Sequence, residues 1–305
     1  MAVYEQTYKR YAGPLTPEWS RFLIIARHAY RSVFSSKLFT AFFVICFLPL
    51  LVEAILIYLH HNVGAIAAMQ VNVRELVPID AFFFQTFISL QGGFAFFVAL
   101  LVGPPLVARD LRNNALPLYL CRPFSRTEYV MGKMSVILIL VSLMTWVPQL
   151  LLFLFQSYLE GFAWFRANVW MVNAIVLGGL IWALLLALLT QTISALVKWR
   201  VVASGILLGI FFIPTVFGAF VNEVFRTRWG NIISLGALIK NVTAGLFGTF
   251  ERATDVIRMR DFDGTITELQ MFEPPLWASW VVLFVICAVC LALLSWKVKA
   301  YEVVR

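Results

Sequence analysis

The sequence predicts an all-α polytopic membrane protein with six transmembrane helices, an N-terminal amphipathic interfacial helix and both termini in the cytoplasm. Three observations predict it: the composition, six long apolar runs and an uneven distribution of Lys and Arg. Of the 305 residues, 61% are hydrophobic and 13% are charged, whereas soluble domains average roughly 45–50% apolar and about 25% charged residues. A soluble globule of this size could not bury so much apolar surface, and disordered chains are poor in apolar residues. We therefore expect residues 1–305 to form a single transmembrane domain.

The first expected element is an interfacial helix over residues 16–36. Thr16 is a suitable N-cap and Pro17 suits the first helical position. Arg27 and Arg31 lie across the helix from an apolar stripe at helical spacing, which consists of Trp19, Phe22, Leu23, Ala26, Tyr30, Val33 and Phe34. Such a basic helix is expected to lie flat on the inner leaflet, or alternatively to pack in the cytoplasm against another subunit. The polar N-terminus lacks the apolar core of a cleavable signal peptide.

Six apolar runs follow, each long enough for the roughly 20 helical residues that cross a bilayer core. The second run is expected to be kinked or ended by Pro104 and Pro105, and the third and fifth contain Pro148 and Pro214. Residues 198–200 alone separate the fourth run from the fifth, so these two form a tight antiparallel pair. The predicted spans are residues 38–59, 81–107, 134–155, 169–197, 201–221 and 277–296.

Orientation follows from the positions of the basic residues. Most of the 24 Lys and Arg residues fall before the first run, between the second and third, between the fourth and fifth, or after the sixth. The positive-inside rule places these segments in the cytoplasm. We expect the plasma membrane, which in a bacterium is the inner membrane. The large outer loop, residues 222–276, should form one or two short helices over 231–250, and its charged part, 251–273, should lie in water.

The sequence contains little that points to chemistry. It has three histidines and no H-E-x-x-H or G-x-S-x-G motif. Cys287 and Cys290 have C-x-x-C spacing, but they lie in an apolar helix and are expected to pack there. Gly132-Lys133 lacks the rest of a phosphate-binding loop. We therefore expect no catalytic, cofactor-binding or metal-binding residue, and a membrane-embedded enzyme is the least favoured class.

Polar residues inside the spans suggest a second kind of site. Glu53 is the one acid within a predicted span, and intramembrane ionisable groups usually face a cavity or a partner. Gln85, Ser89 and Gln91 lie among phenylalanines and glycines in the second span. We assign these four residues to a translocation path or a dimer interface. The alternatives are a structural role for Glu53 near the outer end of its helix and ordinary packing within the bundle for the second span.

The loop over residues 109–130 is the most specific segment. It mixes charges with apolar side chains, which predicts a short helix that docks on another surface. Ser125 can cap the next helix, with Glu128 completing a capping box. The loop contains Asp110, then Leu120-Cys121-Arg122-Pro123-Phe124-Ser125-Arg126, and finally Tyr129 and Gly132-Lys133.

This pattern resembles the permease subunits of type-2 ABC transporters. In that family an acid after the second span precedes a leucine-rich stretch and a Leu-x-Arg-Pro-x-Ser-Arg-x-x-Tyr-x-x-Gly-Lys run. The six-span layout, the N-terminal helix, the short fourth-to-fifth connection and the basic tail extend the resemblance over nearly the whole chain. Asn114 stands where the family often has glycine.

The resemblance implies a mechanism and partners. Two permeases would pair in the lipid bilayer, and each would dock a separate ATP-binding subunit that holds ATP and Mg, so no cofactor is expected in this chain and nucleic acid is not an expected partner. The first, second and fifth spans would line the permease interface, and the transporter would export an unidentified substrate. A subunit that transmits ATPase motion to an outer partner is the alternative. The implied docking residues are Asp110, Leu116, Leu118, Tyr119, Arg122, Pro123, Arg126, Arg27 and Arg31.

Overall fold

The computed structural model describes residues 21–62, 78–113, 126–197, 199–250, 257–260, 266–269 and 273–297. Within these ranges it contains six helical segments long and apolar enough to cross a membrane. All six predicted spans are thereby confirmed as apolar helical segments, with ends that shift by a few residues. The observed segments are Lys37–His61, Ala81–Ala108, Thr127–Glu160, Trp170–Leu196, Arg200–Phe225 and Leu276–Lys297.

Helix α1 (Arg21–Phe34) precedes the first span, which consists of two helices, α2 (Lys37–Ile45) and α3 (Leu48–His61). The side chain of Ser36 caps α2 by accepting a hydrogen bond from the Phe39 amide. The break falls at Cys46 and Phe47, and Pro49 lies in the first turn of α3, where a missing N–H costs nothing. The sequence prediction treated this span as continuous. The expected cap of α1 at Thr16 and Pro17 lies outside the described residues.

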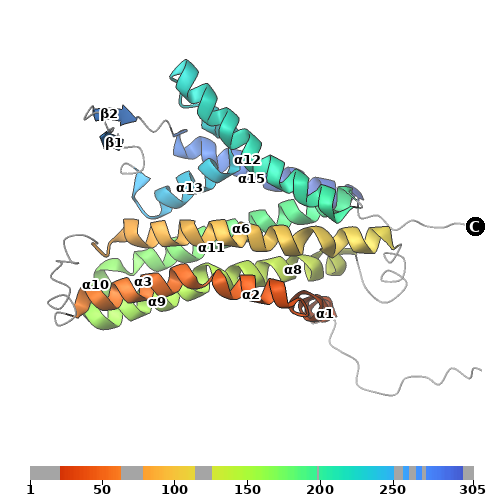
Figure 1. Cartoon of the computed structure of the whole chain (residues 1–305), viewed down its shortest axis with the longest axis horizontal. Coiled ribbons are helices and arrows are strands. Elements are labelled where there is room, and N and C mark those ends of the chain that lie inside the picture. The colour runs from red at the N-terminus through yellow and green to blue at the C-terminus, as the bar shows by residue number, and fades with distance from the viewer. Residues whose placement is uncertain are drawn as a thin grey trace, which may run out of the picture.

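Helices α6 (Ala81–Arg112) and α11 (Trp170–Leu196) run side by side through the centre of the molecule (Figure 1). Small residues bring them close. A Cβ on Gly103 would lie 2.5 Å from the Thr190 Cβ, and a Cβ on Gly92 would lie 2.9 Å from the Trp182 indole nitrogen. Helix α6 continues past Pro104 and Pro105 to Arg112, so the prolines do not end it.

The third span consists of α8 (Arg126–Met144) and α9 (Trp146–Glu160), separated at Thr145. Pro148, predicted inside a continuous span, therefore lies in the first turn of α9. The helix starts earlier than the predicted residue 134, because polar residues of its first turns are buried against neighbouring helices. The short helix α10 (Phe162–Asn168) connects α9 to α11.

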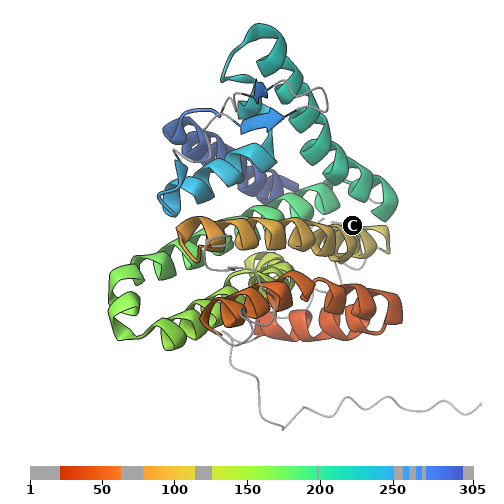
Figure 2. The same cartoon turned by 60° about the vertical axis from the view of Figure 1, so that its left-hand side comes forward.

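The C-terminal part forms a second layer against α6 and α11 (Figure 2). Helix α12 (Arg200–Phe225) starts against α6, and its C-terminal half extends away from the bundle (Figure 1). The 3₁₀ helix η2 (Gly230–Ile233) and α13 (Leu235–Leu246) confirm the short helices predicted for residues 231–250. Helix α15 (Leu276–Lys297) packs on α11 and α13.

A short hairpin is the only β-structure among the described residues. Strand β1 (Ile257–Arg260) pairs with β2 (Ile266–Leu269) in antiparallel register, with Ile257 opposite Leu269. It lies in the charged stretch of the large loop, for which the sequence analysis predicted no secondary structure.

Candidate functional site

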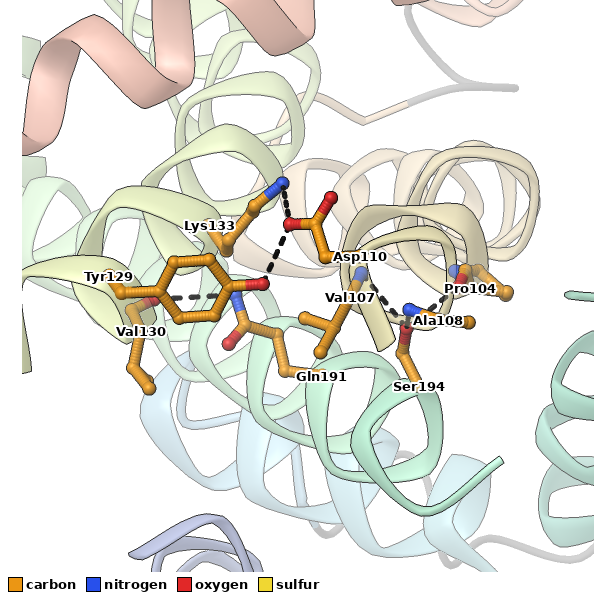
Figure 3. A network of polar contacts seen from close by, with 9 residues as sticks. All are labelled: Pro104, Val107, Ala108, Asp110, Tyr129, Val130, Lys133, Gln191 and Ser194. Carbon is orange, nitrogen blue, oxygen red and sulfur yellow. Dashed lines mark hydrogen bonds and ion pairs between the residues drawn. The ribbon is translucent and has the colours of Figure 1, made fainter. Parts of the chain in front are cut away.

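A polar network lies where the C-terminal end of α6 meets the first turns of α8 (Figure 3). The Lys133 Nζ lies 2.8 Å from the Asp110 Oδ2, and the Tyr129 hydroxyl donates to the same oxygen at 2.7 Å. Tyr129 and Lys133 are four residues apart, so they share one face of α8. Tyr129 is 1% exposed and Lys133 7% exposed. The structure therefore brings together three residues of the loop motif in one charge-paired cluster, in which Tyr129 and Lys133 are buried and Asp110 is partly exposed.

This arrangement gives Asp110 a partner within the chain. A buried carboxylate is stable only when it is paired and hydrogen-bonded, and here a cation and a phenol satisfy it. The loop motif predicted Asp110 as a residue that docks the ATP-binding subunit, but not its partners Tyr129 and Lys133. The signal for them was present, because Tyr129 and Lys133 follow at helical spacing in the same motif.

A second set of hydrogen bonds holds α6 at its two prolines. Proline has no N–H, so Pro104 and Pro105 leave carbonyls one turn earlier without helical partners. The Ser204 hydroxyl of α12 donates to one of these, the Leu100 carbonyl, at 3.5 Å.

On the other side of the prolines, the Ser194 hydroxyl of α11 donates to the Pro104 carbonyl at 2.6 Å and accepts from the amides of Val107 and Ala108 at 3.2 and 2.8 Å (Figure 3). Ser194 is fully buried. The sequence analysis missed it. A proline pair inside an apolar helix leaves carbonyls that need donors from outside the helix, but the sequence does not say which helix supplies them.

Helix α1 packs beside this network. The Tyr30 hydroxyl donates to the Val136 carbonyl of α8 at 3.1 Å, and burial raises the pKa of Tyr30, which keeps it a donor. Ile25, Ala26 and Ala29 are buried. The two predicted docking residues of α1, Arg27 and Arg31, are exposed.

Most of the predicted docking loop cannot be placed. Leu116, Leu118, Tyr119, Arg122 and Pro123 lie outside the described residues, as does the predicted cap Ser125. Arg126 is the first residue of α8, but its side chain lies outside the description. The end of α6 and the start of α8 flank this loop, and Asp110, Tyr129 and Lys133 join these two helices.

The four residues assigned to a path or interface have separate surroundings. The Gln149 amide donates to the fully buried Glu53 carboxyl at 2.6 Å, which joins α3 to α9. Gln91 donates to the Cys46 carbonyl at 2.8 Å, at the break between α2 and α3. The amide oxygen of Gln85 accepts a hydrogen bond from the Thr249 hydroxyl. The fourth residue, Ser89, is exposed and lines a pocket between α6, α11 and α13.

The histidines and cysteines form no metal-ligand cluster within the described ranges. The His61 Nε2 lies 2.6 Å from the Glu160 carboxylate and its Nδ1 lies 3.0 Å from the Ile57 carbonyl. The described cysteines Cys46, Cys287 and Cys290 are free thiols.

The sequence matches no protein-family model and no curated protein. The six apolar helices indicate a multi-pass membrane protein. Any more specific function has to be inferred from the residues themselves, and the Asp110 network with the loop it flanks is the most specific feature they offer.

Proposed function

We propose that the chain is the permease subunit of a type-2 ABC transporter and that, as a dimer with separate ATP-binding subunits, it forms an ATP-driven path for export of a substrate. One observation carries the proposal. Asp110, Tyr129 and Lys133 stand at the motif positions that resemble this family, and they form a single charge-paired cluster that joins α6 to α8, the helices on either side of residues 114–125.

The geometry suggests how this loop would transmit force. The ion pair between Asp110 and Lys133 joins the end of α6 to the start of α8, so a push on the loop displaces both helices together. Ser194 and Ser204 keep α6 hydrogen-bonded across its prolines. Motion of a docked ATP-binding subunit would thereby travel along α6 to its N-terminal part, where Ser89 and Gln91 lie.

Orientation is part of the proposal. Both termini and the loop 114–125 would face the cytoplasm, because the basic residues concentrate in these segments. Helix α1 would lie at the inner leaflet, with Arg27 and Arg31 toward lipid phosphates or the ATP-binding subunit. The exposure of these arginines and the burial of Ala26 and Ala29 against the bundle support this placement. Nucleotide and Mg would be held by the partner subunit, and the complex would reside in the plasma membrane.

A second candidate is a subunit that passes ATPase motion to a partner outside the membrane. The hairpin of β1 and β2 favours it, because it gives a defined structure to a charged loop between α13 and α15. This candidate uses the same docking loop as the permease. It differs in that the ATPase motion moves a partner protein outside the membrane and carries no substrate across it.

The test is charge reversal in the loop. Arg122→Glu and Arg126→Glu should each weaken binding or stimulation of the ATP-binding subunit by roughly tenfold or more, since like charges across an interface cost several kcal/mol. Arg258→Glu, in β1, is the matched control and should leave coupling unchanged. Co-purification and ATPase rate of the reconstituted complex are the readouts. Full coupled activity in both loop variants would refute the docking assignment.

A further inference from the structure

A pocket of about 200 Å³ lies between α6, α11 and α13. Its walls are mostly glycine backbone and apolar side chains, and Lys240 supplies a positive charge. Ser89, Gly93, Gly236 and Lys240 are exposed and form its rim. Gly92, Gly178, Gly179, Trp182 and Thr243 are among the residues that line its interior.

The pocket lies within the membrane-spanning part of the bundle. Ser89 and Gly93 belong to the span Ala81–Ala108, and Trp182 belongs to the span Trp170–Leu196. At 1.5 Å per residue, Ser89 lies about 12 Å along α6 from its first residue. Asp110 lies roughly 30 Å farther along the same helix. The pocket is therefore at bilayer depth and far from the proposed docking loop.

Three hydrogen-bond donors in this pocket lack a full set of partners. Lys240 makes no ion pair with any described residue, although the Glu273 carboxylate is close enough to interact with it electrostatically. Thr243 is 6% exposed, and its hydroxyl forms no hydrogen bond with the described part of the chain. The Ser89 hydroxyl is likewise without a described partner. Hydroxyls without partners are costly at bilayer depth, so Ser89 and Thr243, beside the Lys240 ammonium, point to a ligand with acceptor oxygens.

Hydrogen bonds on the other side of α13 fix its rotation. Asn241 donates to the Pro274 carbonyl at 2.7 Å and to the Ser279 hydroxyl at 2.8 Å, and the Ser234 hydroxyl caps the helix while bonding Thr215 of α12. With α13 held this way, Lys240 and Thr243, three residues apart, share the face that lines the pocket.

We propose that this pocket binds an anionic glycerophospholipid from the surrounding bilayer. Its acyl chain would lie against the Trp182 ring and against Gly93 and Gly236, where a Cβ would meet no atom within 4 Å. Its phosphate oxygens would accept hydrogen bonds from the Lys240 ammonium and from the hydroxyls of Ser89 and Thr243. The ammonium would also supply the charge that balances the phosphate. The site requires no ATP-binding subunit, so it is independent of the proposed function.

The test uses the full chain in nanodiscs of phosphatidylcholine that contain a small fraction of a photoreactive phospholipid. One sample carries phosphatidylglycerol with a diazirine in its acyl chain, and a second carries phosphatidylcholine with the same chain. After illumination, mass spectrometry of peptides locates the adducts. The phosphatidylglycerol probe should label residues 88–93 and 236–243 roughly fivefold more than the phosphatidylcholine probe, as expected for one lysine near an anionic lipid.

Two pairs of variants distinguish the contribution of the Lys240 charge from that of the open volume of the pocket. Lys240→Ala should remove the fivefold preference, whereas Lys240→Arg should retain it. Gly93→Leu should abolish labelling by both probes, because a Cβ there meets no atom within 4 Å and the side chain can fill the pocket. Gly205→Leu, at an equally open glycine on α12, is the control and should change nothing. A monodisperse elution profile confirms that each variant is folded.

Three results would overturn the proposal. Equal labelling by both probes in the wild-type chain would indicate a groove for neutral lipid. Unchanged labelling in Gly93→Leu would place the lipid on the surface outside the pocket. Absence of lipid adducts, together with crosslinks between two copies of the chain at these residues, would assign the pocket to a second copy.

Discussion

The ion pair between Asp110 and Lys133 allows a quantitative test of the proposed coupling site. Its two charges lie 2.8 Å apart with side-chain exposures of 15% and 9%. The Tyr129 hydroxyl donates to the same carboxylate. The substitutions are Asp110→Asn and Lys133→Met, alone and together, because each removes one charge while keeping most of the side-chain volume.

The expected magnitudes follow from burial. Removing one partner of a buried pair costs about 3–5 kcal/mol, because the other charge remains without compensation. Asp110 keeps some contact with solvent, so we expect the lower end, about 3 kcal/mol for each single variant. The double variant leaves no unpaired charge and should lose no more than either single variant, about 1 to 3 kcal/mol, which gives a coupling energy of about 3 to 5 kcal/mol.

The free energies of unfolding of these variants can be measured in mixed micelles by titration with a denaturing detergent. The matched control is the exposed pair of Glu223 and Arg226, 3.2 Å apart with exposures of 61% and 69%. Exposed pairs contribute roughly 0–1 kcal/mol, so the same cycle there should give a coupling below about 0.5 kcal/mol. If the Asp110–Lys133 coupling is no larger than this control, Asp110 is not held within the chain and the reasoning fails.

Three further predictions concern other parts of the molecule. Ser194→Ala should lower the free energy of unfolding by about 1–2 kcal/mol in the same micelle assay, because three hydrogen bonds to α6 are lost; an unchanged value would remove its role at the prolines. Burial raises the pKa of Glu273, so its carboxyl binds protons more tightly folded than unfolded. Glu273→Gln should therefore raise the unfolding temperature at neutral pH, with the gain lost on acidification below the ordinary pKa of Glu; a pH-independent difference would contradict this. Glu53→Gln and Gln91→Ala should alter transport by the reconstituted complex without loss of assembly, and normal transport in both would exclude them from the path.

The spans were predictable because bilayer thickness sets a simple length rule. A run of about 20 apolar residues identifies a helix whatever its neighbours are, so the six segments follow from composition alone. The breaks inside the first and third spans were less accessible. Pro49 and Pro148 were visible in the sequence, but whether a proline kinks a helix or starts a new one depends on which partners satisfy the neighbouring carbonyls.

The candidate site was predictable in part. The motif located Asp110, Tyr129 and Lys133, but the sequence did not show that they bond to one another. Ser194 could not be found, since one serine in an apolar helix has no local signature and its role arises from the helix packed against it. The pocket at Lys240 was missed for a similar reason. The sequence analysis treated Lys240 as a residue of an outer loop, whereas α13 packs it beside spans α6 and α11.

The close contacts between α6 and α11 have a mechanical consequence. Gly92 against Trp182, Gly103 against Thr190, and the Ser194 hydrogen bonds fasten the two helices at three heights. Sliding or rotation of one past the other would break all three contacts, so we expect the two helices to move together as one rigid unit. A displacement at the end of α6 would then carry α11 with it, and the break at Cys46 and Phe47 would be the nearest place where the structure can bend.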